Sequence, residues 1–161
     1  MNWCVVYTKR GQERRALENL ERQGFACYLP VLRLQKLLRG VVTNAQEPLF
    51  PRYLFVQLDA DKGWSTLRST KGVTRLVSFG TDPALVPAAL IERLRLEEAA
   101  ARVAPVFQAG EAVRIGAGAF SGIEGIFLMQ DGESRALVLI QLLQQPARLQ
   151  VELSSIRPAN R

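Results

Sequence analysis

The clearest pattern of hydrophobic and polar positions in the chain runs from residue 47 to residue 58, Glu-Pro-Leu-Phe-Pro-Arg-Tyr-Leu-Phe-Val-Gln-Leu. Pro48 and Pro51 fix φ and lack a backbone donor, so they predict a stiff approach to a strand that begins at Tyr53. Two interpretations stay open: an exposed aromatic docking surface, or a strand buried on both faces within a small sheet. Strict alternation would send Tyr53, Phe55 and Gln57 to one face and Leu54, Val56 and Leu58 to the other.

The first hundred residues predict an α+β domain that ends near residue 101. Residues 11–23 have helical spacing, with Ala16, Leu17 and Leu20 on one side, and Gly24 then provides a stop signal. Strands are predicted at 3–8, 25–34, 53–58 and 73–79, a turn at Arg39-Gly40 leads into an extended arm at 41–43, and helices are predicted at 62–69 and 87–101.

A second, smaller unit is expected from residue 110 to residue 161. Residues 102–109 have little periodicity and one proline, which is typical of a linker. Glycines spaced through β-branched residues, a hairpin turn signal at Asp131-Gly132 and clean alternation over 149–153 are typical of short strands. Together these signals favour a compact five-stranded barrel, because about fifty residues cannot enclose a large cavity.

Residues 135–145, Arg-Ala-Leu-Val-Leu-Ile-Gln-Leu-Leu-Gln-Gln, carry conflicting signals. The alanine, leucines and glutamines favour a helix, whereas the β-branched Val138 and Ile140 favour a strand. The apolar run is nearly continuous, so its period does not decide between the two. Helix and strand both stay open for this segment.

The composition is that of a globular protein, with 48% hydrophobic and 22% charged residues. No apolar run is long enough to cross a bilayer and the first residues do not resemble a signal peptide, so a cytoplasmic protein with no membrane partner is expected. Cys4 and Cys27 lie in apolar contexts in a chain without histidine, which predicts buried free thiols and no metal site. No heptad pattern or apolar surface stripe demands a dimer, so we expect a monomer.

Catalytic signals are missing from the sequence. It has no histidine, no nucleophile elbow, no phosphate-binding loop and no cluster with metal-ligand spacing. Carboxylate neighbours such as Asp59 with Asp61 and Glu97 with Glu98 are typical of solvated charges rather than of acid–base pairs. We therefore predict no enzymatic activity, no catalytic residues and no cofactor.

Positive charge is concentrated in the first half of the chain. Residues 1–80 carry thirteen Lys or Arg against six Asp or Glu, while residues 81–161 carry eight against nine. A solvated surface and a polyanionic partner are both consistent with this asymmetry. Phosphate contact is the functional interpretation of two clusters, the first formed by Lys9, Arg10, Arg14, Arg15 and Arg22, with Arg33, Lys36 and Arg39 extending it, and the second by Arg68, Ser69, Thr70 and Lys71.

Motifs along almost the whole chain resemble the NusG-type transcription elongation factors. The N-terminal match rests on Trp3, Lys9-Arg10-Gly11-Gln12, Leu20-Glu21-Arg22-Gln23, Leu29-Pro30, the 47–56 segment and Gly72-Val73, while residues 113–127 resemble the KOW motif. Four stretches are closer to RfaH, the operon-specific paralogue, than to general NusG: Glu47-Pro-Leu-Phe-Pro51, Ser78-Phe-Gly80 with Pro83 and Val86-Pro87, Gly118-Ala-Phe-Ser-Gly122, and Asp131-Gly-Glu-Ser-Arg135. The resemblance implies an antiparallel sheet flanked by helices at 1–101, a linker at 102–109 and a KOW domain at 110–161.

The resemblance also implies a transcription antitermination factor that suppresses pausing and termination. Its N-terminal domain would bind the clamp helices of the RNA polymerase β′ subunit, and Ser65 and Thr66 would reach the β gate loop. The residues matched to the clamp-helix patch are Tyr7, Phe50, Pro51, Tyr53 and Phe55.

RfaH-type proteins additionally contact the non-template DNA strand. Asn19 stands where the RfaH pattern has a histidine, and Arg68 replaces an asparagine, so the DNA element read by this chain stays open. The residues matched to the DNA contact are Lys9, Arg10, Arg15, Asn19, Gln23, Arg39, Arg68 and Lys71.

In RfaH-type proteins a helical hairpin formed by the C-terminal domain hides the clamp-helix patch. On release this domain refolds to a barrel and recruits a small-subunit ribosomal protein, which couples transcription to translation. Pro146 falls inside the second helix of such a hairpin, where it would remove a hydrogen bond and kink or end the helix. The residues matched to the interdomain contact are Glu47, Phe127, Arg135, Val138 and Leu142.

Two alternatives to the operon-specific factor remain. A constitutive general NusG would use the same patch, bind polymerase without a DNA signal and engage the termination factor Rho. A ribosome-associated RNA-binding protein is the more remote alternative, because KOW motifs also occur in ribosomal proteins.

Overall fold

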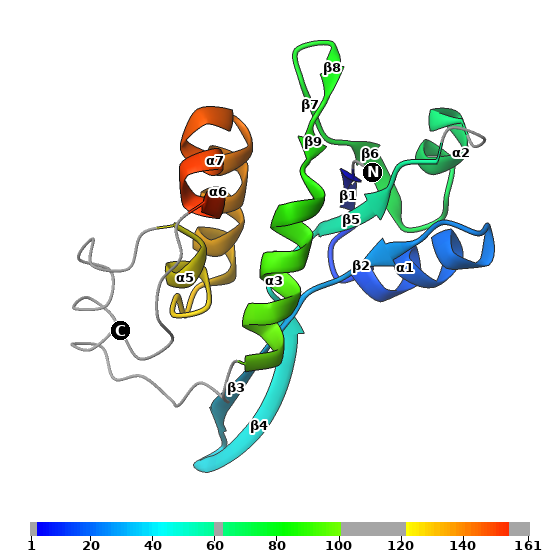
Figure 1. Cartoon of the computed structure of the whole chain (residues 1–161). Helices are drawn as coiled ribbons and strands as arrows, with labels where there is room; N and C mark the ends of the chain where they lie inside the picture. The colour runs from blue at the N-terminus through cyan, green and yellow to red at the C-terminus, as the bar shows by residue number, and fades with distance from the viewer. Residues whose placement is uncertain (1–2, 60–62, 101–121, 155–161) are drawn as a thin grey trace.

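The computed structural model describes residues 3–59, 63–100 and 122–154 (Figure 1). The N-terminal part contains β1 (Trp3–Thr8), α1 (Glu13–Arg22), β2 (Cys27–Tyr28), β3 (Val31–Leu38), β4 (Val41–Pro48), β5 (Tyr53–Gln57), α2 (Trp64–Arg68), β6 (Val73–Leu76), β7 (Ser78–Phe79), β8 (Asp82–Pro83), β9 (Leu85–Val86) and α3 (Ala88–Ala100). The C-terminal helices are α5 (Gly122–Ile126), α6 (Gly132–Leu143) and α7 (Pro146–Ser154). The mixed α+β class expected from the sequence is confirmed.

The main sheet is antiparallel and has β1 at its centre. Its strand order is β2-β5-β1-β6, and β9 pairs with β1 as well. The β1–β5 register places Val5 opposite Phe55 and Tyr7 opposite Tyr53. Because β1 is apolar over Trp3–Val6 and those residues are buried, the strand has the pattern of a sheet covered on both faces.

The two faces of this sheet pack into two separate hydrophobic clusters. The alternation predicted for β5 is confirmed, since Phe55 belongs to one cluster and Leu54 to the other. Ala16 and Leu20 of α1 cover the Leu54 face, while α3 and the C-terminal helices cover the Phe55 face (Figure 1). Of the two interpretations of this segment, burial on both faces is the one observed.

Strands β3 and β4 form a long hairpin that extends beyond the main sheet (Figure 1). The turn predicted at Arg39-Gly40 is present, and both residues have positive φ, 51° and 79° respectively. Two consecutive positive φ values are typical of a type I′ turn, whose twist matches that of the flanking strands. The register runs from Leu38 opposite Val41 to Val31 opposite Pro48, which leads β4 into the turn before β5.

Residues 122–154 form three helices joined by short turns, and two sequence expectations are wrong here. Asp131-Gly132 is not a hairpin turn, because Asp131 caps α6: its side chain accepts hydrogen bonds from the Ser134 backbone nitrogen at 3.1 Å and the Ser134 hydroxyl at 2.8 Å. Residues 149–153 belong to α7 instead of forming a strand. The ambiguous 135–145 segment lies mainly in α6, whose apolar side packs on the N-terminal part.

The expectation that Pro146 would kink or end the second helix is also wrong. Pro146 is the first residue of α7. Its missing N–H removes no intrahelical hydrogen bond there, and its fixed φ suits the first helical turn. The chain therefore turns between α6 and α7 without loss of either helix.

None of the helices in the described ranges is long and apolar enough to cross a membrane.

Candidate functional site

The five residues matched to the clamp-helix patch gather around the β1–β5 pair, and we call them the aromatic face. The rings of Tyr7 and Tyr53 lie 5.1 Å apart between centroids, in the cross-strand positions set by the register. Phe50 packs edge-on against Phe55 at 6.1 Å. The aromatic face consists of Tyr7, Phe50, Pro51, Tyr53 and Phe55.

The C-terminal helices cover much of the aromatic face. Phe50 is 1% exposed and Phe55 is fully buried, in the same hydrophobic cluster as Ile126, Leu139 and other residues of these helices. The exposed docking surface, one of the two interpretations of the sequence, is therefore covered in this structure. Tyr7 and Tyr53 are half-buried, and burial raises the pKa of Tyr53 above its ordinary value.

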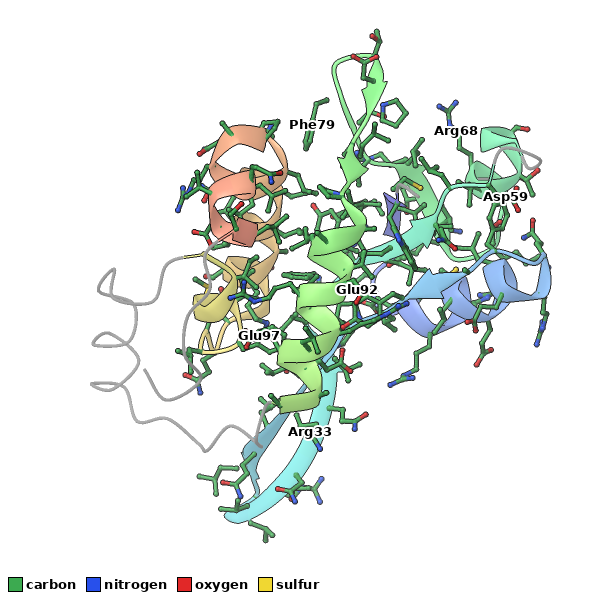
Figure 2. All side chains as sticks on the ribbon, in the orientation of Figure 1. Arg33, Asp59, Arg68, Phe79, Glu92 and Glu97 are labelled. Carbon is green, nitrogen blue, oxygen red and sulfur yellow. The ribbon has the colours of Figure 1, made fainter. Side chains whose placement is uncertain are left out.

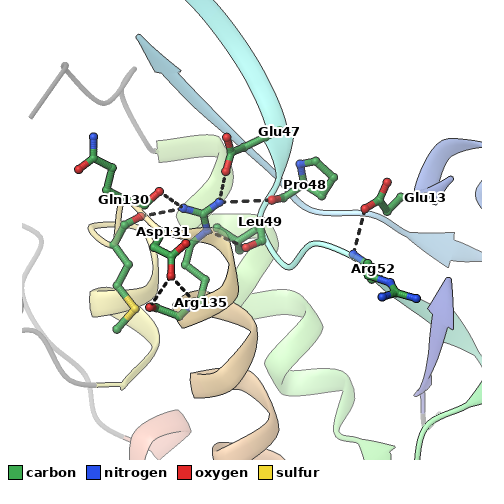
Figure 3. Close-up of polar contacts among 10 residues, drawn as sticks. Glu13, Glu47, Pro48, Leu49, Arg52, Gln130, Asp131 and Arg135 are labelled. Carbon is green, nitrogen blue, oxygen red and sulfur yellow. Dashed lines mark hydrogen bonds and ion pairs between the residues drawn. The ribbon is translucent and has the colours of Figure 1, made fainter. Parts of the chain in front are cut away.

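A buried guanidinium holds the start of α6 against the N-terminal part (Figure 3). The side chain of Arg135 is fully buried, and its Nη2 donates to the Glu47 carboxylate. Its Nε donates to the Leu49 carbonyl oxygen at 2.7 Å, and its Nη1 donates to the Met129 carbonyl oxygen at 2.8 Å. Since a buried cation without partners would be very costly, this set of acceptors is what makes the burial of Arg135 possible.

The other interdomain residues matched in the sequence lie on the same side of the C-terminal helices. Leu142 is 1% exposed, and Phe127 and Val138 are partly buried against the same cluster. The structure thus brings Glu47, Phe127, Arg135, Val138 and Leu142 to a single contact between the two parts of the chain.

The turn before β5 depends on two residues that sequence reasoning did not single out. Arg52 has a positive φ of 73°, and its backbone nitrogen donates to the Glu13 carboxylate at 2.9 Å (Figure 3). The Arg52 guanidinium donates through Nε to the Thr8 carbonyl oxygen and lies 4.2 Å from the centroid of the Tyr7 ring. The sequence signal for this contact was Glu13, the acidic residue at the first position of α1. Its partner, however, is set by tertiary contact.

A second group of residues joins α1 to the turn after α2. Asn19 Nδ2 donates to the Lys71 carbonyl oxygen at 3.2 Å, and Gln23 Nε2 donates to the Thr70 hydroxyl at 2.9 Å. The turn can approach α1 this closely because residue 72 is a glycine: a Cβ there would lie 2.9 Å from the Ala16 nitrogen. These contacts fix the positions of side chains that the sequence matched to a DNA contact.

Most cations of the predicted DNA contact lie on this side of the molecule, but Arg39 does not. Arg68 ends α2 and its side chain points away from the sheet (Figure 2), while Lys9 is linked to the same turn through its backbone bond to Gly72. Arg39 lies at the tip of the β3–β4 hairpin, at the other end of the N-terminal part (Figure 1). The exposed residues near α1 and α2 are Lys9, Arg10, Arg15, Gln23, Arg68 and Lys71, and Asn19 is partly buried.

Ser65 and Thr66, matched to the β gate loop, are exposed on the short helix α2. They lie on the opposite side of the sheet from the C-terminal helices (Figure 1). A surface on α2 is thus accessible while the aromatic face is covered.

A further aromatic and charged group near α3 was not foreseen from the sequence. The Tyr28 hydroxyl donates to Glu98 at 2.7 Å, and the Arg95 guanidinium lies 5.1 Å from the Tyr28 ring centroid and 5.5 Å from that of Trp3. Burial raises the pKa of Tyr28, and the hydrogen bond to Glu98 adds to this. These contacts join α3 to the sheet. The spacing of residues within α3 or within the strands could not have indicated them, because the partners come from distant parts of the sequence.

The described residues contain no arrangement that would bind a metal. No group of three or more His, Cys, Asp or Glu side chains in these ranges is positioned around an ion. Cys4 and Cys27 are free thiols that flank Val56 in the sheet, as buried and half-buried side chains respectively. Burial raises the pKa of each thiol to about 12, which makes both poor nucleophiles and poor ligands.

The fold and the site define a class: a small α+β protein whose aromatic sheet face is covered by its own C-terminal helices. A family model described as transcription termination factor NusG matches residues 1–95, from the start of the sheet into α3. The chain belongs to the NusG family, whose members are transcription factors and not enzymes.

Several curated relatives are similar over nearly the whole chain, and each is named transcription termination/antitermination protein NusG. The relative from Rickettsia bellii is 24% identical over 168 residues, which cover 96% of this chain and 88% of the relative. The Deinococcus radiodurans protein is 23% identical over 186 residues, covering 97% and 98%. The Thermus thermophilus protein is 25% identical over 179 residues, covering 97% of each chain.

Proposed function

We propose that this chain is an operon-specific elongation and antitermination factor of the RfaH type. The observation that carries the proposal is the covered aromatic face: α6 packs over Phe50 and Phe55, and the buried Arg135 is bound to Glu47. A factor that bound polymerase constitutively would gain nothing from covering the surface that it needs. A covered surface instead suits a factor that acts only after a specific signal.

The aromatic face is proposed to bind the clamp helices of the RNA polymerase β′ subunit. Clustered aromatic side chains on a rigid sheet supply large contact area at low entropic cost, as interface hot spots do. Since Phe50 and Phe55 are buried by the C-terminal helices, these helices must leave before the full face can bind. Ser65 and Thr66 on the accessible α2 are proposed to contact the β gate loop.

The cations near α1 and α2 are proposed to contact the non-template DNA strand. Asn19 and Gln23 hold the Lys71 turn against α1, so Lys9, Arg68 and Lys71 are presented from a fixed scaffold. Such cations give affinity through the phosphates, while amide side chains such as Gln23 can hydrogen-bond base edges. Arg39 is separated from this group and would contact a different stretch of nucleic acid.

Refolding of the C-terminal domain into a barrel after release is part of the proposal. The balanced propensities of residues 135–145 favour neither helix nor strand decisively, so the contact with the aromatic face can decide the state. The released domain would then recruit a small-subunit ribosomal protein and couple transcription to translation. These steps rest on the resemblance to RfaH and on the helical cover described above.

Capture of RNA polymerase elongation complexes on scaffolds with varied non-template sequences tests the proposal. The wild-type chain should bind only where a particular sequence is present, whereas Glu47→Ala should bind all scaffolds because it weakens the contact that holds α6. Glu92→Ala is the matched control, since Glu92 is exposed on α3 (Figure 2), and it should behave as wild type. If the Glu47→Ala chain binds no scaffold, the polymerase-binding role is wrong.

A constitutive NusG-like elongation factor is the second candidate. It is favoured by the relatives named NusG, which match this chain over nearly its whole length. In that case the wild-type chain would bind every scaffold as well as Glu47→Ala does. The same capture experiment therefore separates the two candidates.

A further inference from the structure

A polar pocket lies between the C-terminal half of α3 and the base of the β3–β4 hairpin. Its volume is about 440 Å³, within the range of sites that take small molecules. Arg95 and Glu98 line it from α3, and Tyr28 and Gln46 line it from β2 and β4. Arg33, which pairs with Gln46 across the β3–β4 ladder, adds a positive charge beside the end of α3 (Figure 2). None of these residues belongs to the aromatic face or to the cations near α1 and α2.

The Arg95 guanidinium is held in position by aromatic rings and not by hydrogen bonds. It lies within cation–π range of Tyr28 and Trp3, and the Tyr28 ring is itself stacked against Phe55 at 6.2 Å. In the part of the chain that the structure describes, no acceptor takes a hydrogen bond from this guanidinium. Its N–H groups are therefore available to a ligand with two adjacent acceptors, which arginine binds in a bidentate manner.

The Glu98 carboxylate provides acceptors beside these donors. Arg95 and Glu98 are three residues apart on α3, so they are neighbours on one side of the helix. Glu98 Oε1 accepts the Tyr28 hydroxyl at 2.7 Å, whereas Oε2 accepts no hydrogen bond from any residue in the described ranges. This carboxylate would repel a bare anion. The pocket therefore favours a ligand that presents acceptors to Arg95 and donors to Glu98.

We propose that this pocket binds an unpaired guanine base. Guanine carries the acceptors O6 and N7 on one edge, which is the edge that arginine most often contacts in a bidentate manner. Its adjacent edge carries the N1–H and N2–H donors, which a carboxylate such as that of Glu98 accepts. Adenine has an amine in place of O6 and would turn a donor toward Arg95. Arg33 would favour the phosphate attached to the base. The inference goes beyond the proposed function and does not depend on it.

The test is an NMR titration of the labelled full-length chain with GMP, and with short single strands of RNA and of DNA that carry one guanine among pyrimidines. We expect shift changes at the Val31 and Ala99 methyl groups and the Gln46 side-chain amide, which line the pocket. Guanine probes should bind about tenfold more tightly than matched adenine probes. Tighter binding of a strand than of GMP would assign a nucleic acid as the source of the base, and equal binding would assign a free nucleotide. Both results support the base site.

Two variants separate contacts to guanine from the fold of the pocket. Glu98→Gln can still accept the Tyr28 hydroxyl, but it replaces the second acceptor oxygen by a donor. It should weaken GMP binding about tenfold and abolish the preference for GMP over inosine monophosphate, which lacks the N2 amine. Arg95→Lys keeps a cation near the rings but loses the bidentate fork, and it should also weaken binding about tenfold. The matched controls are Glu92→Gln and Arg93→Lys, which change residues of the same helix that do not line the pocket and should bind as wild type does.

Three outcomes would overturn the inference. The first is the absence of shift changes at Val31, Gln46 and Ala99 with every guanine probe, and the second is equal binding of guanine and adenine probes. The third is wild-type affinity in both Glu98→Gln and Arg95→Lys, which would place any observed binding outside this pocket. Because the titration contains no polymerase, its failure leaves the proposed function untouched, and failure of the capture experiment likewise leaves this pocket untouched.

Discussion

At the scale of single residues, the contact between the two parts of the chain depends on groups with little freedom to rearrange. The Arg135 guanidinium is fully buried and depends on acceptors from both parts of the chain, the Glu47 carboxylate and the Leu49 and Met129 carbonyls. Gly132, three residues earlier, faces Pro51 of the aromatic face. Small changes at these positions are therefore expected to weaken the contact between the C-terminal helices and the N-terminal part, and to leave the main sheet unchanged.

Gly132→Ala should weaken the docking of α6. The added Cβ would lie 2.6 Å from Pro51 Cγ and 3.1 Å from Pro51 Cδ, and the ring cannot move aside as the end of a flexible side chain could. Overpacking of this kind costs about 1–3 kcal/mol. Hydrogen exchange of the α6 amides should accelerate roughly tenfold or more, since each 1.4 kcal/mol is a factor of ten.

The matched control for Gly132→Ala is Gly63→Ala, where the nearest atom to the added Cβ is Ser65 Oγ at 3.8 Å. That variant should leave the exchange of α6 unchanged. Unaltered protection of α6 in Gly132→Ala would contradict the close packing of residue 132 against Pro51.

The two thiols should resist alkylation in the folded chain at pH 8. With each pKa raised to about 12 by burial, only about one thiol in ten thousand is ionised at that pH. Iodoacetamide labelling followed by mass spectrometry should show both cysteines unmodified in buffer and modified in urea. Rapid labelling of either residue in buffer would contradict the burial described here.

The same pKa shifts have a defined sign for stability. A thiol whose pKa rises from 9.0 to about 12 on folding keeps its proton in the folded state where the unfolded chain has lost it. Below pH 9 the two thiols therefore make their full contribution to the free energy of unfolding. This contribution is lost as the pH rises toward 12. Alkaline pH should destabilise the fold for this reason.

At the scale of elements, α6 and α7 show how position decides the effect of a residue. Asp131 and Pro146, which suggested a turn and a helix break, instead occupy the cap of α6 and the first position of α7. Both residue types are favourable at helix N-termini and unfavourable a few residues later. Their meaning could not be assigned until the helix boundaries were known.

Pro146→Ala should leave α7 intact and lower stability by only about 0.5–1 kcal/mol, because the change mainly frees the unfolded chain. Gln150→Pro, four residues further into the same helix, removes an internal hydrogen bond and should cost about 3 kcal/mol. Far-ultraviolet circular dichroism of the full-length chain should show lost helix only for Gln150→Pro. Equal losses in both variants would contradict the position of Pro146 at the start of α7.

At the scale of the whole molecule, the two hydrophobic clusters differ in whether they depend on the C-terminal helices. The cluster around Leu54, Val56 and Leu20 is built entirely from N-terminal residues. The cluster around Phe50 and Phe55 includes side chains of the C-terminal helices. Opening of these helices should therefore disrupt one cluster and leave the other in place.

Native-state hydrogen exchange should reveal this division. Amides of residues 122–154 should exchange through an opening of lower free energy than amides of β1 and β5. Glu47→Ala should speed exchange in the helices by about ten- to a hundredfold, since it leaves a buried cation short of a partner, and should barely affect the two strands. A single exchange class that spans both parts would show that the chain opens only as one unit.

The sequence alone predicted the elements whose signals are local. Alternation placed β5 and its two faces, helical spacing placed α1, and Arg39-Gly40 placed the hairpin turn. Matched motifs also pointed to Glu47 and Arg135, which do meet in the structure. These features follow from short-range sterics and periodicity, which act on residues near one another in the chain.

Only the tertiary structure decided the state of residues 135–153 and the accessibility of the aromatic face. The local propensities of Val138 and Ile140 oppose those of the leucines and glutamines around them, so neither strand nor helix is set within the segment. Packing on Phe50 and Phe55, together with the cap at Asp131, accompanies the helical state. The partners of Arg52 and Arg95 depended likewise on contacts between distant elements, because a buried group takes its partner from whatever the fold brings beside it.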